Sequence, residues 1–365
     1  ARTRLIDCVS HGNGNNGFLV LPDARNVLIQ GGSAFDNTVS GIGLAGGTDI
    51  TIRDMTFYST GEDGGPDGSF QANAILTDNW GDSAASPRLP IEGIQPIDGL
   101  TIDNVTVHDH PDYGIRISAY NETLSRFPSG RIATTNLQLT NSHIYNNGSR
   151  LSDFVGGLYH LGGVLIQHVD GGLVAGNVIE DNYFWGIDAY RCNDIVYRDN
   201  WFLDNNRGMD TPGITFEPVN VEINGGLRNQ FTNNLVYGSF AGLFLSWIPD
   251  SNDGALFGPD SITVEDNIMA GHTEGGFSMV VNGNGLSSRT VRNNFIERVD
   301  PAHLTYLRED LGIDLEAPRL GNIIGAAPGF ADAPGGDFTL LPSSPLQDNF
   351  WGPSNLRSTS PSNDY

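Results

Sequence analysis

The chain has 365 residues, including 47 glycines and 19 prolines, and only 17% of its residues are charged. No apolar run approaches the roughly 18 residues of a membrane-spanning helix, which excludes a helical membrane span. The formal net charge is −24, and all 19 basic residues are arginine. Such an acidic surface repels nucleic acids and anionic membranes, so we expect neither as a partner.

A five-residue phrase, usually opened by glycine, recurs nine times along the chain. Its second and fourth residues are nearly always apolar, whereas the third and fifth vary. This two-residue period is typical of a β-strand, and its recurrence every 23 to 49 residues indicates a repeat fold. The copies begin at Gly17, Gly41, Ala74, Gly114, Gly163, Gly186, Gly213, Gly242 and Gly276.

A second strand motif follows each phrase and carries an asparagine at one equivalent position. These asparagines are Asn177, Asn200, Asn234, Asn267 and Asn294. Stacked side-chain amides can bond to the coils above and below, and asparagine tolerates the left-handed backbone of a tight turn, so we expect a ladder. Two strands and a shorter third would make one coil of about 22 to 30 residues, and only the stacking of coils buries its apolar face.

This combination resembles the right-handed parallel β-helix of pectate lyases, alginate epimerases and many glycoside hydrolases, over roughly residues 5–340. The stretch Pro328–Leu346 is similar to the closing segment of secreted β-helix enzymes that act on polysaccharides. The resemblance implies an all-β solenoid of about ten coils and a secreted, carbohydrate-active enzyme. We expect the β-helix domain over residues 1–340 and a C-terminal tail, 341–365, on or beyond the last coil.

The chain begins in mid-coil, because Leu5 to Cys8 already matches the second strand motif. We expect that an N-terminal cap was removed or that another chain or domain covers this end, and a homo-oligomer remains open. Cys8 and Cys192 lie in distant coils, so no disulfide is expected. Coils are lengthened at 61–99, 120–132, 150–162, 247–260 and 300–321, where insertions are expected to wall a binding groove.

Alternation places the third and fifth residues of each phrase on the outside of the coil. In the middle coils, these positions and their neighbours collect ionisable and aromatic residues, which is typical of a substrate groove. They are Asp78, Arg116, Gln167, His168, Asp188, Tyr190, Arg191, Glu217 and Trp247.

Two of these residues, Asp188 and Glu217, align on adjacent coils two residues out of register, which puts their Cα atoms roughly 8 Å apart. One carboxyl can then protonate a glycosidic oxygen while the other activates water, and separations of about 6.5–9.5 Å accompany inversion. The leading expectation is therefore a glycoside hydrolase with this catalytic pair. The alternative is that each carboxylate forms an ordinary surface ion pair with an arginine, and for Asp188 this would be Arg191 or Arg116.

A rival mechanism uses Arg116, His168 and Tyr190 as a uronate lyase or C5-epimerase, which must neutralise a carboxylate and move the C5 proton. Mannuronan epimerases carry a similar Tyr, His and Asp set, but their Y-G-F-D-P-H-E motif is matched here only at its start, by Tyr113 to Ile115. An acidic protein repels a polyuronate, which favours hydrolysis. If His168 takes no part in this chemistry, we expect it to be a turn residue that caps the strand.

The expected substrate is a polysaccharide or oligosaccharide, bound by Arg191, Gln167, Asp78 and by stacking on Trp247, Tyr113 and Trp185. Trp80 is a further aromatic candidate, although aromatic residues also simply cover coils. No cofactor is expected, apart from calcium at Glu62, Asp63 and Asp67, whose oxygens suit that ion. The non-catalytic alternative is a β-helix adhesin with a flat, ion-paired outer face.

Overall fold

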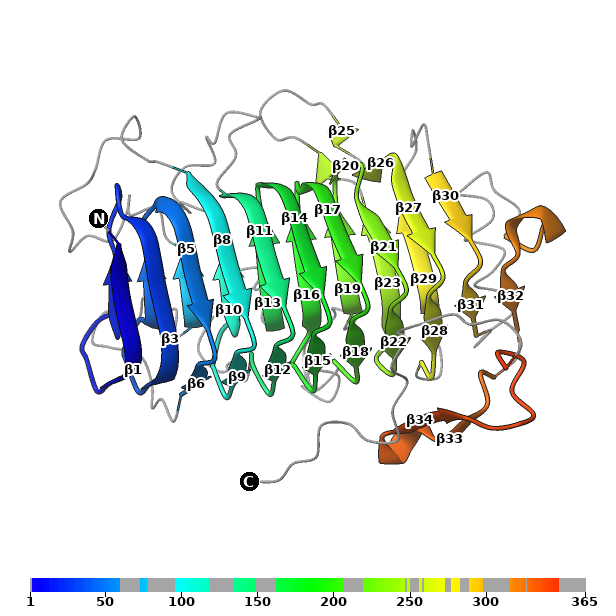
Figure 1. Ribbon diagram of the computed structural model, residues 1–365. Coiled ribbons are helices and arrows are strands. Elements are labelled where there is room, and N and C mark those ends of the chain that lie inside the picture. Colours follow the sequence, from blue (N-terminus) through cyan, green and yellow to red (C-terminus); the bar gives the residue numbers. More distant parts are fainter. Residues whose placement is uncertain are drawn as a thin grey trace.

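A computed structural model shows a solenoid of stacked β-strands that begins at residue 3 and ends at residue 324 (Figure 1). The structure describes residues 2–59, 73–77, 96–118, 134–148, 162–205, 219–246, 248–249, 256–257, 259–272, 277–282, 289–297, 315–325 and 327–347. Each coil contributes one strand to a nine-stranded sheet and two to a 19-stranded sheet, and the strands of neighbouring coils pair in parallel. The expected parallel β-helix is thus confirmed.

The nine-stranded sheet contains eight of the nine copies of the recurring phrase, and the copy at Gly213 lies outside the described residues. Its strands are β2 (Phe18–Val20), β4 (Ser40–Leu44), β7 (Asn73–Thr77), β10 (Ile115–Ile117), β13 (Gly162–Gln167), β16 (Trp185–Tyr190), β19 (Val219–Asn224), β23 (Ala241–Ser246) and β29 (Phe277–Asn282).

The 19-stranded sheet bends at the corner between the second and third strand of each coil. Its second strands are β5 (Gly47–Arg53), β8 (Ile97–Asp103), β11 (Thr134–Thr140), β14 (Val169–Ala175), β17 (Asn193–Arg198), β21 (Gln230–Thr232), β27 (Ile262–Glu265) and β30 (Arg289–Arg292). Its third strands are β6 (Thr56–Tyr58), β9 (Thr106–His108), β12 (His143–Tyr145), β15 (Val178–Glu180), β18 (Trp201–Leu203), β22 (Leu235–Tyr237), β28 (Ile268–Ala270), β31 (Phe295–Ile296) and β32 (Ile323–Ile324). Strands β1 (Thr3–His11) and β3 (Arg25–Phe35) continue through the corner.

Shorter elements lie outside the two sheets. They are the pairs β20 (Gly226–Leu227) with β26 (Pro259–Asp260), β24 (Ile248–Pro249) with β25 (Leu256–Phe257), and β33 (Phe330–Asp332) with β34 (Asp337–Leu340), and the 3₁₀ turns η2 (Pro318–Leu320) and η3 (Ala333–Gly335). Phe338 of the last hairpin packs edge-on against Trp201 and Tyr237, at 5.5 and 5.2 Å between ring centroids. The hairpin therefore covers the outside of the third strands in the C-terminal coils.

The alternation of the phrase sorts its side chains as expected. In β16, Ile187 and Ala189 lie in the core inside the coil, and in β23 Leu243 and Leu245 do the same. Asp188 alternates with these core residues, so it faces outward. Burial of apolar side chains at about 25 cal/mol per Å² is the main stabilising contribution in such a fold, and each coil obtains it only from its neighbours.

Two copies of the phrase were aligned wrongly. The strand that pairs with β16 is β19, so Glu222 lies opposite Asp188, and the copy at Gly213 does not supply this strand. In β29, Met279 lies opposite Leu243. The observed pairing therefore differs by two residues from the pairing expected from the phrase. The first error arose because Asn220 occupies the place of the usual opening glycine, beside Gly186 and Gly242.

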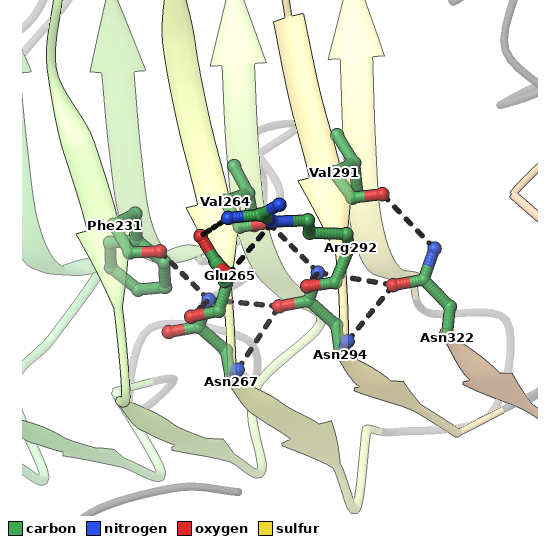
Figure 2. A network of polar contacts seen from close by, with 8 residues as sticks. All are labelled: Phe231, Val264, Glu265, Asn267, Val291, Arg292, Asn294 and Asn322. Atoms are coloured by element: carbon green, nitrogen blue, oxygen red, sulfur yellow. Dashed lines mark hydrogen bonds and ion pairs between the residues drawn. The ribbon is translucent and has the colours of Figure 1, made fainter. Parts of the chain in front are cut away.

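The expected asparagine ladder is present where the second strand turns into the third. The backbone N–H and the side-chain Nδ2 of Asn177 both donate to Asn200 Oδ1, at 3.1 and 2.9 Å, and Asn200 donates in the same way to Asn234. Figure 2 shows the C-terminal end of the ladder, from Asn267 through Asn294 to Asn322. Each amide thus satisfies buried backbone donors of the neighbouring coil.

The left-handed backbone lies one residue earlier than expected. The positive φ angles belong to the residues before the ladder, such as Asp199 (φ 57°) before Asn200 and Asn233 (φ 56°) before Asn234. Aspartate and asparagine are the side chains that best tolerate this region. In each turn, one residue therefore adopts the left-handed backbone conformation, and the next residue makes the ladder hydrogen bonds.

A second ladder, which the sequence analysis did not anticipate, lies at the turn that leads back to the nine-stranded sheet. Asn147, Asn182 and Asn205 each donate to the next asparagine, and the series ends at Asn220. Asn220 is the residue that replaces the opening glycine. Its membership in this ladder explains why an amide is found at that position.

Cys8 and Cys192 are both free, in agreement with the expectation. Within the described ranges, no helix has the length and apolar character needed to cross a membrane.

We predict that Asn200→Ala lowers the free energy of unfolding by roughly 2–5 kcal/mol, because it leaves several buried groups of the neighbouring coils without partners, at about 1–3 kcal/mol each. Urea denaturation followed by circular dichroism measures this. The matched control is Gln230→Ala, at an exposed position of β21, which should change stability by less than about 0.5 kcal/mol. Equal effects of the two substitutions would contradict a structural role for the ladder.

His272 makes the stability depend on pH. It is buried with its Nδ1 2.9 Å from the carbonyl oxygen of Gly238, and burial lowers its pKa from 6.5 to about 4. Between these values the unfolded chain binds the proton more readily, so His272 reduces stability as pH falls from 6.5 to 4, by up to about 1.4 kcal/mol per pH unit. His272→Gln should flatten the dependence of unfolding free energy on pH in this window. An unchanged slope would contradict this assignment.

Candidate active site

The candidate site lies on the outer face of the nine-stranded sheet, from β10 to β23. The strand register aligns Arg116, Leu165, Asp188, Glu222 and Phe244 in one outward row, here named the central row. Neighbouring strands are about 4.8 Å apart. Asp188 and Glu222 are therefore immediate neighbours, and Arg116 lies two strands away from Asp188.

The central row presents two carboxylates side by side. Asp188 is only 2% exposed, whereas Glu222 is partly exposed. Parallel neighbours in direct register bring their carboxyl groups to a separation of the order of the strand spacing, about 5 Å. Two like charges at this distance repel each other, so the site needs nearby donors or cations.

One such donor is Tyr113, which directly precedes the phrase of β10. Its hydroxyl donates to Asp188 Oδ2 at 3.2 Å, across the intervening coil of Leu165. Tyr113 is 1% exposed, and burial, followed by the neighbouring charges of Asp188 and Asp112, raises its pKa well above the usual range. The phenol therefore stays protonated at neutral pH and donates a hydrogen bond to Asp188.

A further donor, at the equivalent position of β16, contacts the second carboxylate. Trp185, at the start of β16, donates its indole Nε1–H to Glu222 Oε2 at 2.6 Å. Hydrogen bonds to a charged acceptor are short and strong, and this distance is at the short end of that class.

Arg116 supplies a positive charge on the same row. Its Nη1 lies 3.5 Å from Asp112 Oδ2, and its Nε donates to Ser118 Oγ at 3.3 Å. The side chains of Arg116 and Asp112 are 11% and 15% exposed. This pair is thus held in place but accessible, as a site for a substrate carboxylate requires.

A second row lies two residues further along the strands and is polar but uncharged. It contains Gln167, Tyr190, Asn224 and Ser246 in direct register. Amides and hydroxyls of this kind can bond to sugar hydroxyl groups. The outer face therefore combines a charged row with a neutral row that runs parallel to it.

His168 and Arg191 occupy the corner after β13 and β16. Both have left-handed backbones, with φ of 54° and 52°, and the guanidinium of Arg191 lies 5.4 Å from the ring centre of Tyr190. Burial, with a smaller contribution from Arg191, lowers the pKa of His168 to about 4. His168 is thus a turn residue, as in the alternative reading, and its imidazole is uncharged at neutral pH.

The structure brings together Arg116, Tyr113, Asp188, Gln167 and Tyr190, with Trp185, His168 and Arg191 beside them. Other predicted residues lie outside the described ranges, namely Asp78, Trp80, Glu217, Trp247 and the calcium candidates Glu62, Asp63 and Asp67. Among the side chains that the structure describes, no group of three or more His, Cys, Asp or Glu is placed to hold a metal ion.

Sequence reasoning missed Glu222 and Asp112. The signal for Glu222 was present, because residues 219–224 read V-N-V-E-I-N, with apolar residues at every second position. The phrase usually opens with glycine, and this feature favoured the copy at Gly213 instead. Asp112 lies in the turn before the phrase, where alternation gives no information about side-chain direction.

The family comparison agrees with this architecture. Residues 92–247 match the model of a family described as a right handed beta helix region, so the parallel β-helix is right-handed. A search of the curated proteins finds no match.

The chain is also similar to solved structures of low sequence identity. A double mutant of the periplasmic alginate epimerase AlgG is 11% identical, with a TM-score of 0.49, over 80% of this chain and 68% of that chain. The A-module of the Azotobacter vinelandii mannuronan C-5 epimerase AlgE6 is 17% identical, with a TM-score of 0.40, over 80% of this chain and 57% of that chain. A mutant of the PL6 family alginate lyase AlyGC is 11% identical, with a TM-score of 0.41, over 99% of this chain and 55% of that chain. The present chain thus spans little more than half the length of the last two.

We predict that Glu222→Gln raises the stability of the protein at pH 7, because it removes one of two like charges in direct register, worth roughly 0.2–1 kcal/mol. The melting temperature measures this. The control is Glu265→Gln, which removes a carboxylate that lies 2.8 Å from Arg292 and should not stabilise. A fall in melting temperature for Glu222→Gln would contradict this prediction and show that interactions of the charged carboxylate, such as the hydrogen bond from Trp185, outweigh the repulsion from Asp188.

Proposed function

We propose that the protein acts on uronic acid-containing polysaccharides by moving the proton at C5 of the sugar, as a lyase or an epimerase. The observation that carries this is the hydrogen bond between Tyr113 and Asp188 on a face that also presents Arg116. These groups are a proton donor, a carboxylate and a cation for the substrate carboxylate. Together they are the types that such proton transfer requires.

In this proposal, Arg116 binds the carboxylate of the sugar and so stabilises the negative charge that forms when the C5 proton leaves. The Asp188 and Glu222 pair or the neutral His168 accepts that proton. In elimination, the C5–H electron pair becomes the C4–C5 double bond, and the oxygen at C4 leaves with a proton, for which Tyr113 is the donor. In epimerisation, a proton returns to C5 from the opposite face instead.

The neutral row supports a sugar substrate that lies along the solenoid axis. Gln167, Tyr190, Asn224 and Ser246 run parallel to the charged row over four consecutive coils. A chain of sugars laid along this face would place one carboxylate at Arg116 and its hydroxyls along the neutral row. Since such polymers occur outside the cytoplasm, an extracellular or periplasmic location belongs to the same proposal.

A retaining glycoside hydrolase is the second candidate. Direct register of Asp188 with Glu222 gives a carboxyl separation of about 5 Å, near the 5–5.5 Å that accompanies retention. The earlier expectation of inversion depended on the two-residue offset between Asp188 and Glu217. With Glu222 as the neighbour of Asp188, a hydrolase on this face would retain configuration.

The test is a panel of alginate, polygalacturonate and neutral glycans with three readouts. We expect unsaturated product, or a changed uronate composition by NMR, on at least one polyuronate. Tyr113→Phe, Asp188→Asn and Arg116→Gln should each lower kcat/KM by about 10²–10⁴-fold, as loss of a general acid or base does. The control is Asp199→Asn, the same chemical change at a corner of the 19-stranded sheet.

New reducing ends without unsaturation would favour the hydrolase. Absence of activity on every polyuronate, from a folded protein, would contradict the main proposal.

A further inference from the structure

The indole of Trp185 and the carboxylate of Glu222 form a pair whose role follows from their surroundings. The two residues lie on adjacent coils, with 2.6 Å between Nε1 and Oε2. We propose that Trp185 is a positioning residue that holds the Glu222 carboxylate next to Asp188, rather than an aromatic platform for sugar. This inference rests on the proposed function only in taking Glu222 to face the reacting sugar.

The packing of Trp185 excludes the stacking role expected from sequence. Trp185 is 6% exposed and belongs to a cluster with Phe184, Val219 and Ala241, on which Phe240 and Phe244 also pack. Its ring lies 5.4 Å from that of Phe184, at an interplanar angle of 45°. A ring that binds sugar by stacking must present a free face, whereas this ring is enclosed and directs its N–H to Glu222.

Glu222 lies between a like charge and an apolar ring on the neighbouring strands. On one side, Asp188 of β16 presents a like charge in direct register, and on the other side Phe244 of β23 offers no polar atom. The cation of the central row, Arg116 of β10, lies three strands away from Glu222 and beside Asp112. A fixed N–H dipole at Oε2 offsets the repulsion from Asp188 and restricts a flexible side chain.

The test replaces the donor and keeps the packing. In Trp185→Phe, the carboxylate of Glu222 loses a hydrogen bond that favours its charged form, so its titration midpoint should rise by about one pH unit, a tenfold change in proton affinity. Carbon-13 NMR of protein labelled at the glutamate carboxyl carbons follows this titration, and the Glu222 signal is assigned by its absence in Glu222→Gln. This measurement needs no substrate, so it stands whether or not the proposed function is correct.

The matched control is Trp201→Phe, an identical change at a tryptophan that is 8% exposed and packs against Phe338 on the far side of the coil. It should leave the Glu222 titration unchanged. In an active enzyme, Trp185→Phe should also shift the acidic limb of the kcat profile upward by the same amount and leave KM within twofold. An unchanged Glu222 titration in a folded Trp185→Phe protein, or a large rise in KM alone, would overturn the proposal.

Discussion

The direct register between neighbouring coils is the constraint on which the other features depend. Parallel pairing at about 4.8 Å places each residue over its counterpart in the next coil, so like side chains meet. For apolar residues such as Ile187 and Val221 this produces a continuous core, and for Asn200 and Asn234 it produces a hydrogen-bonded ladder. The same register also places two carboxylates side by side at Asp188 and Glu222, where like charges repel each other.

This difference distinguishes the residues that stabilise the fold from those of the candidate site. Along both ladders each asparagine satisfies the next, and the first coils present a stack of rings in which His11, Phe35 and Tyr58 lie 4.7–4.8 Å apart. The central row instead changes from a cation at Arg116 to carboxylates at Asp188 and Glu222 and then to an aromatic ring at Phe244. Natural sequences depart from local consistency mainly where function requires it. The adjacent carboxylates, which accept hydrogen bonds from Tyr113 and Trp185, are such a departure.

Much of the fold was predictable because it depends on periodicity. The alternation of the phrase identified the buried positions, and the recurrence of asparagine identified one ladder at the correct residues. The second ladder was missed although Asn182 and Asn205 follow Asn177 and Asn200 at a constant spacing of five residues. Its last member, Asn220, breaks this spacing because it lies within β19. The site was predicted only in part, since the alignment of β19 depended on a glycine that Asn220 replaces.

The sequence by itself determined the parallel β-helix, the inward and outward sorting of each strand, and the outward position of Arg116 and Asp188. These follow from a period of two, which is a local property of the backbone. Only the tertiary structure decided which residue lies beside Asp188, because that depends on how much chain each coil takes up between strands. It likewise decided the partners of Tyr113 and Trp185, whose contacts cross coils 75 and 37 residues apart in sequence.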